Sequence, residues 1–156
     1  MTSLPRALLM NPNSNAATTR AMVAIAAQFL PDVQGWTAPG GPGLLSNMAV
    51  LADSARYVAG ADIPGDIGGV IVSAFGDPGR AALAERLDVP VVGIGQAAAQ
   101  AAAVGGRRYA VVTHTPALVA GIDALMLASA PGGAYLGTFL AEGEPLTLSG
   151  DAALLD

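Results

Sequence analysis

Small and hydrogen-bonding residues follow several apolar runs of this chain, and these are the residues that could do chemistry. The segment "NPNSN" (11–15) offers amide side chains and backbone N–H groups at the start of a predicted helix, a combination that favours an anion such as a carboxylate. In the alternative interpretation, Asn11, Asn13 and Ser14 only form an Asx turn and a cap, with Ser14 as the N-cap of the helix. The sequence leaves both interpretations open.

His114 is the single histidine of the chain and directly follows the apolar run "AVVT" (110–113). Histidine titrates near neutral pH and is the usual acid or base of an active site, so His114 is the candidate for proton transfer. A lone histidine is also often a structural hydrogen-bonding residue, and that alternative stays open. Asp77 in "FGDPG" (75–79) is predicted to be a turn residue before Pro78 rather than a catalytic acid.

The segment "GIGQAA" (93–98) fits the dinucleotide-binding pattern G-x-G-x-x-G/A in its loosest form, between a predicted strand and a predicted helix. No acidic residue follows at the distance that is needed to hold a ribose, because the nearest one is Asp123. We therefore interpret these glycines as sites of close packing between strand and helix. We expect no nucleotide, no metal and no other cofactor.

Five or six short apolar runs can bring these segments together, because ligands bind beyond the carboxyl ends of the strands in an open parallel sheet. The runs alternate with alanine-rich helical patterns, which is typical of an α/β domain with a mainly parallel sheet. The predicted strands cover residues 6–10, 33–37, 69–75, 90–95, 109–114 and 134–140.

Two of the predicted helices have a clear apolar face. One is expected to end at Pro31, and its face is formed by Met22, Ile25, Ala26 and Phe29. The other ends at "APGG", and its face is formed by Leu118, Ile122, Leu125 and Met126. Between the second and third strands, residues 39–43 ("PGGPG") are too rich in turn formers for regular structure, and we expect a mobile loop over the site.

The composition limits the classes of partner. The 156 residues are 53% hydrophobic and 12% charged, with a net charge of −5 and no basic patch, so we expect no nucleic-acid partner. The uncharged stretches 89–106 and 124–141 are interrupted by proline and glycine, so we expect no membrane span and a cytoplasmic protein. The excess of apolar residues indicates a homo-oligomer or a core that another segment completes. With no cysteine, disulfides and thiol catalysis are excluded within this chain.

Four segments together resemble the aspartate/glutamate/hydantoin racemase superfamily, and above all its hydantoin and allantoin racemase branch. They are "NPNSNAATT" (11–19), "FGDPG" (75–79) with its following helix, "PVVGIGQAA" (90–98) and "GGRRYAVVT" (105–113), in the family's order and roughly its spacing. The resemblance implies two pseudo-symmetric flavodoxin-like α/β lobes, parallel sheets with helices on both faces, and an active site between them. We expect a shortened version of this fold, with a first lobe at 1–104 and the start of a second, incomplete lobe at 105–156.

The resemblance also implies a cofactor-independent reaction in which two cysteines, one from each lobe, face opposite sides of the substrate's α-carbon. One removes the proton and the other returns it. This branch carries its first cysteine directly before "FGDPG", where this chain has Ala74, and the second belongs to a carboxyl-terminal part that the resemblance, over residues 6–130, does not reach. What carries over is the binding half of the site, formed by Asn11, Asn13, Ser14, the turn from Ala74 through Phe75 to Gly76, and Thr113.

Two functions from different classes follow. The first is a racemase-like isomerase or a lyase that acts on a small carboxylate, amino-acid or hydantoin-type compound, with His114 as acid or base in place of the thiols. The second is a catalytically inactive homologue that binds a small carboxylate or ureido compound or pairs with a complete homologue. In a further version of the second, Ala74 replaces a natural cysteine in an inactivated form.

Overall fold

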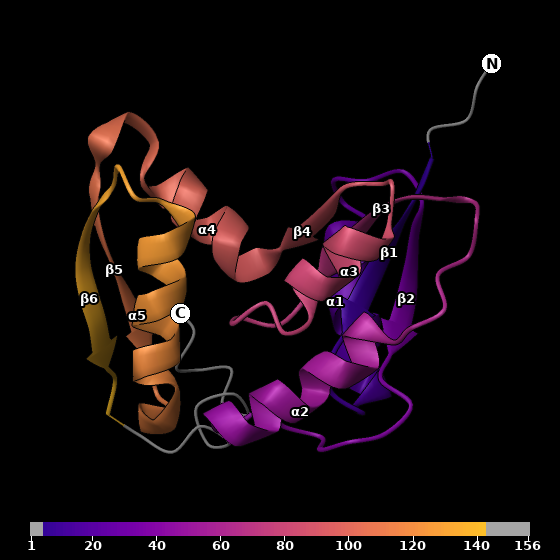
Figure 1. Cartoon of the computed structure of the whole chain (residues 1–156), viewed down its shortest axis with the longest axis horizontal. Helices are drawn as coiled ribbons and strands as arrows, with labels where there is room; N and C mark the ends of the chain where they lie inside the picture. Colours follow the sequence, from indigo (N-terminus) through magenta and orange to yellow (C-terminus); the bar gives the residue numbers. More distant parts are fainter. Residues whose placement is uncertain (1–4, 143–156) are drawn as a thin grey trace.

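A computed structural model describes residues 5–142 of the chain. Strands and helices alternate along it, and all strand pairs are parallel (Figure 1). The strands are β1 (Arg6–Asn11), β2 (Val33–Thr37), β3 (Ile67–Val72), β4 (Val91–Gly93), β5 (Arg108–Thr113) and β6 (Ala134–Leu140). The helices are α1 (Ala16–Ala26), α2 (Met48–Ala59), α3 (Arg80–Arg86), α4 (Ile94–Ala102) and α5 (Val119–Ser129). None of the helices within residues 5–142 has the length and apolar character that a membrane span requires.

The larger sheet has the strand order β2-β1-β3-β4. The chain moves from β1 to β2 on one side and then returns past β1 to β3, so right-handed crossovers place α1 on one face and α2 and α3 on the other. The contacts agree, since α1 packs against β1 and β2 while α2 packs against α3. This confirms the prediction of an α/β fold with a flavodoxin-like parallel sheet and helices on both faces.

The main core lies between this sheet and the pair α2 and α3. Side chains alternate between the two faces of a strand, so Leu8 and Met10 of β1 enter the same layer as Val70 and Val72 of β3. Val58 of α2 and Leu83 of α3 close the layer from the helix side, and both are fully buried. Burial of each large apolar side chain of this kind stabilises the fold by about 1.5–3 kcal/mol.

The smaller sheet pairs β5 with β6, and α4 and α5 cover one of its faces. Its core joins Met126 of α5 to Tyr109 and Tyr135, whose ring centroids are 5.3 Å apart. Figure 1 shows the two sheets at opposite ends of the long axis of the molecule, with α4 between them. The lobe boundary between 104 and 105 stays a prediction, because α4 contacts both β4 and α5. Residues 143–156 of the expected second lobe lie outside the described residues.

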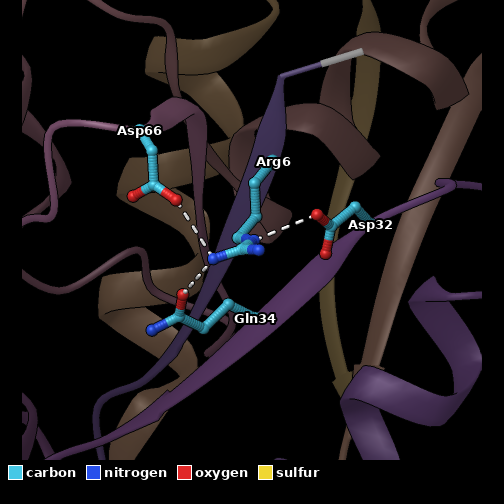
Figure 2. Close-up of polar contacts among 4 residues, drawn as sticks. All are labelled: Arg6, Asp32, Gln34 and Asp66. Carbon is cyan, nitrogen blue, oxygen red and sulfur yellow. Dashed lines mark hydrogen bonds and ion pairs between the residues drawn. The ribbon is translucent and has the colours of Figure 1, made fainter. Parts of the chain in front are cut away.

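A polar cluster joins three strands at the amino ends of the larger sheet (Figure 2). The Arg6 guanidinium at the start of β1 donates to Asp32 Oδ2 at 3.0 Å through Nε, and to Asp66 Oδ2 at 3.1 Å through Nη1. Nη1 also lies 3.4 Å from Gln34 Oε1. Asp32 directly precedes β2 and Asp66 directly precedes β3, so the cluster fastens the strand ends that lie away from the loops following β1, β2 and β3.

Several predicted boundaries were wrong, each for a local reason. The third strand stops at Val72 rather than at residue 75, because the chain turns from Ser73 onward to reach α3. The fourth stops at Gly93 rather than at 95, because Ile94 already begins α4. The first helix ends at Ala26, and Phe29, which was expected on its buried face, is 81% exposed.

The predicted N-cap of α1 was also wrong by one residue. Asn15, with extended backbone, caps the helix, because its Oδ1 accepts the N–H groups of Ala17 at 3.0 Å and Thr18 at 3.2 Å. The Ser14 hydroxyl is engaged elsewhere and donates to the carbonyl oxygen of Gly41 at 3.0 Å.

Candidate active site

A cleft of about 470 Å³ opens where the loops after β1, β2 and β3 meet the end of β5 and the start of α5. This is the position that an open parallel sheet favours for a ligand, beyond the carboxyl ends of its strands. The lining residues are Asn13, Leu44, Leu45, Ser46, Ala74, Phe75, Val111, Val112, Thr113, His114, Thr115, Leu118 and Ile122.

Most of the residues that the sequence singled out meet at this cleft. Those that line it are Asn13, Ala74, Phe75, Thr113 and His114. Asn11, Ser14 and Gly76 lie beside it but are not among the lining residues. The structure therefore brings His114 and Ala74 to one cavity, although they lie far apart in the sequence.

The first loop is ordered by asparagine side chains. The Nδ2 group of buried Asn11 donates to Asn13 Oδ1 at 2.8 Å and to Thr19 Oγ1 at 3.0 Å, and Asn11 Oδ1 accepts the Asn13 N–H at 3.1 Å. Asn13 Oδ1 also accepts the Asn15 N–H at 2.9 Å. The loop thus contains the Asx turn that the sequence allowed, and the anion-binding interpretation stays a prediction. Within residues 5–142, the Asn13 Nδ2 group makes no hydrogen bond, so it is able to donate to a ligand in the cleft.

The turn that carries Ala74 is held by its neighbours. Ser73 N–H donates to the Met10 carbonyl at 2.8 Å, and Asp77 N–H donates to the Ala74 carbonyl at 3.0 Å. Gly76 and Asp77 have φ values of 118° and 49°, the left-handed region that glycine adopts freely and that aspartate tolerates. The side chain of Ala74 takes no part in these bonds, and Ala74 is one of the residues that line the cleft.

Asp77 connects this turn to the start of α4. Its side chain is 8% exposed, and its carboxyl oxygens accept the N–H groups of Gly95 at 2.8 Å and Gln96 at 2.7 Å. A Cβ atom on Gly93 would lie 2.1 Å from Asp77 Cγ, so only glycine fits there. The interpretation of "GIGQAA" as a close-packing segment is therefore correct, and Asp77 is the turn residue that was predicted, with a second role as a cap.

His114, the ionisable residue of the cleft lining, directly follows β5. Thr113 Oγ1 accepts the Thr115 N–H at 3.2 Å, which bends the chain after β5 and leaves His114 half-buried on the cavity wall. Within the described residues the imidazole makes no hydrogen bond, so both ring nitrogens are available to a ligand. No carboxylate, guanidinium or ammonium group is among the lining residues.

A polar anchor behind the cleft ties α5 to β6. Tyr135 Oη donates to Asp123 Oδ1 at 2.6 Å and lies 2.5 Å from Thr138 Oγ1. The hydrogen bond from Tyr135, assisted by Thr138, lowers the pKa of the Asp123 carboxyl, and burial raises the pKa of the Tyr135 hydroxyl. Neither Asp123 nor Tyr135 lines the cleft.

Residues 5–142 contain no cluster of side chains that could bind a metal ion. No three histidine, cysteine, aspartate or glutamate side chains come close enough there to hold a metal ion.

The sequence analysis missed the apolar part of the cleft wall. Leu44 and Leu45 follow the "PGGPG" segment, and Leu118 and Ile122 had been assigned only to a helix core. A signal was available for the first pair, because adjacent leucines in a segment of turn formers have no buried strand or helix face to join. Such leucines point to a surface that a ligand or a neighbouring element covers.

The sequence matches the model of a known protein family. The model of the Asp/Glu/hydantoin racemase family matches residues 8–132. The chain belongs to this family. The match includes every one of the loops that line the cleft, and it confirms the resemblance drawn from the four sequence segments.

Solved structures of racemases have the same fold as this family member. An allantoin racemase from Pseudomonas fluorescens has a TM-score of 0.81 and 29% identity, over 96% of this chain and 66% of that one. An allantoin racemase from Klebsiella pneumoniae also has a TM-score of 0.81, with 22% identity, over 97% of this chain and 64% of that one. This chain thus spans about two thirds of the length of these racemases. A search of the curated proteins found no match.

Proposed function

We propose that this racemase-family chain is a cofactor-independent isomerase that moves a proton at a carbon next to a carbonyl group, with His114 as the acid or base. The substrate is a small carboxylate, amino-acid or hydantoin-type compound. The observation that carries the proposal is the shared cleft, in which His114 lies on the same cavity as Ala74, the position of the family's first cysteine by resemblance.

The proton transfer uses groups that line the cleft. Neutral His114 takes the α-proton, and the electron pair of the C–H bond moves into an enolate whose oxygen becomes negative. The Asn13 amide and the hydroxyl groups of Thr113 and Thr115 are donors that can stabilise this oxygen. Inversion requires that the proton return from the opposite face of the planar enolate, where a water molecule gives it to the carbon, and the imidazolium then gives its own proton to the hydroxide that remains. Loss of carbon dioxide from a carboxylate on the same carbon would produce the same enolate, because the electron pair of the broken C–C bond moves into the neighbouring carbonyl group, so a lyase reaction fits the same groups.

A ureido compound is the substrate class that the comparisons favour. The similar structure from Pseudomonas fluorescens is an allantoin racemase, and allantoin is an uncharged cyclic ureide. An uncharged ring suits a cleft whose lining has no fixed charge, because an ionised group there would lack a charged partner.

The test is exchange of the α-proton in D2O, followed by NMR, with chiral hydantoins, allantoin and amino acids as substrates. We expect the unmodified protein to exchange the α-proton of a hydantoin and the His114→Asn variant to lose at least about a hundredfold in rate, since general acid–base groups contribute about 10²–10⁴-fold. Unchanged exchange in His114→Asn would remove the histidine from the mechanism. Gln28→Asn, at an exposed position in the turn after α1 and outside the cleft lining, is the control.

A second candidate function rests on Ala74 itself. A methyl group stands where the family resemblance puts a thiol, and the chain has no cysteine to replace it. In this candidate the chain binds a carboxylate or ureido compound without turning it over, or pairs with a complete homologue. Exchange that occurs only in the Ala74→Cys variant, together with binding by both forms, would favour the second candidate over the first.

A further inference from the structure

We propose that the loop of residues 39–46 is the specificity wall of the cleft, and that Ser14 and Tyr57 position it. The wall selects an uncharged compound with a bulky apolar substituent and disfavours one with an acidic substituent. The inference rests on the proposed function, because it assumes that the cleft accepts a hydantoin-type ring.

Ser14, in the loop after β1, holds one side of the 39–46 loop. The Ser14 N–H donates to the Pro42 carbonyl at 3.1 Å, and its hydroxyl donates to the Gly41 carbonyl at 3.0 Å. Ser14 is exposed and is not among the lining residues, so these bonds account for a hydroxyl at this position without contact to a ligand.

On its other side, the loop lies next to the ring of Tyr57 in α2. A Cβ atom on Gly40 would lie 3.1 Å from Tyr57 Oη, and one on Gly41 would lie 3.1 Å from Tyr57 Cε2. The two glycines therefore let the backbone lie flat on the ring. Gly41 also has a φ of 92°, which an ordinary side chain rarely adopts. These contacts define the course of the loop in the structure, and its expected mobility stays a prediction.

The course of the loop brings two leucines to the cleft. Leu44 and Leu45 line the cleft from the loop, and Leu118 and Ile122 line it from the start of α5. Leu44 is still 50% exposed, so a ligand can cover apolar surface that the protein leaves in water. Each methylene that a substituent buries here is worth about a fourfold gain in affinity.

The test measures binding by calorimetry, with three probes that differ only in the ring substituent. They are unsubstituted hydantoin, 5-isobutylhydantoin and hydantoin-5-acetic acid. For the unmodified protein we expect 5-isobutylhydantoin to bind at least about thirtyfold more tightly than the other two, from burial of several carbon atoms. Leu45→Ala should lose about tenfold in affinity for the isobutyl compound and much less for unsubstituted hydantoin, so that the ratio of the two affinities falls.

Ser14 variants separate a positioning role from a binding role. Ser14→Ala should reduce the preference for the isobutyl substituent about threefold to tenfold, and Ser14→Thr, which keeps the hydroxyl, should restore it. Ser129→Ala, at the end of α5, is the matched control. Circular dichroism of each variant shows that it is folded.

The outcomes distinguish the two proposals. If all three probes bind equally well, the specificity wall is overturned and the proposed function stands. If Ser14→Ala weakens all three probes by the same factor, Ser14 contributes to ring binding and its positioning role is overturned. If no probe binds the unmodified protein, the hydantoin-type substrate of the proposed function is overturned, and this inference with it.

Discussion

Asp77 shows how one side chain can hold the geometry of a site without facing the ligand. Both of its carboxyl oxygens are used by the first turn of α4, and its own N–H closes the turn that begins at Ala74. Because Asp77 is buried, the loss of either acceptor would leave a backbone N–H of α4 poorly satisfied. The residue therefore links the cleft turn to the helix that leads toward the smaller sheet.

We expect Asp77→Asn to lower the free energy of unfolding by about 1–3 kcal/mol. Asparagine keeps the left-handed backbone at little cost, but its NH2 group would face a backbone N–H of α4 where the second carboxyl oxygen now accepts. Urea unfolding measures the change. Asp62→Asn, on an exposed aspartate, is the control and should stay within about 0.5 kcal/mol of the unmodified protein. A loss at Asp77 no larger than the control would mean that these hydrogen bonds do not stabilise the fold.

At the scale of elements, two neighbouring polar residues at the start of α1 have different roles. Asn15 caps the helix and Ser14 holds the 39–46 loop, although both fit the composition of an N-cap. The sequence could not choose between them, because the bond that occupies Ser14 comes from a loop 27 residues away.

We expect Asn15→Ala to destabilise the protein by about 0.5–2 kcal/mol, the usual cost of a lost N-cap. Ser14→Ala should cost less, since the bonds of Ser14 involve an exposed loop and not the helix end. Thermal unfolding of the two variants side by side measures the difference. The opposite order of stabilities would return Ser14 to the capping role.

Elements with one dominant signal could be predicted, and elements that depend on neighbours could not. β2 and β6 have the bounds that were expected, 33–37 and 134–140, because turn formers flank both runs. The face of α5 that contains Ile122 and Met126 is buried as expected. β4 was drawn too long, because its run continues without a break into α4 and only packing against Asp77 decides where the helix begins.

At the scale of the whole molecule, the second sheet is the less covered part. Leu136 and Phe139 of β6 are 49% and 55% exposed, and α5 lies on the side of the sheet that faces the larger one (Figure 1). Parallel sheets usually have both faces covered. The expected homo-oligomer, or pairing with a complete homologue, would supply such a cover and stays a prediction.

The acid stability of the molecule should depend on the anchor between α5 and β6. The pKa of Asp123 is lowered by its bond from Tyr135, so this group stabilises the fold above its unfolded pKa of about 4, and the contribution is lost as the pH falls through the folded pKa. We expect the urea midpoint of Asp123→Asn to fall less steeply than that of the unmodified protein between about pH 5 and about pH 2. This range includes the unfolded pKa of an aspartate, which is about 4. Parallel curves for the two proteins would show that the anchor does not contribute.

The cleft could be predicted in its polar half and not in its apolar half. Asn13, Thr113 and His114 end or follow strands, and topology alone brings strand ends to one edge of a sheet. Leu44 and Leu45 reach the cleft only because Ser14 and Tyr57 direct their loop, a long-range effect that no local pattern contains.

The turn around Ala74 has a consequence for protein engineering. Its shape is set by the hydrogen bonds that Ser73 N–H donates to the Met10 carbonyl and Asp77 N–H donates to the Ala74 carbonyl, and by those that the Asp77 carboxylate accepts from α4. None of these bonds uses the side chain at position 74. We therefore expect that alanine, serine or cysteine at this position leaves the backbone of the turn unchanged. A small panel of substitutions at this one site would allow different reaction chemistries to be compared on the same scaffold.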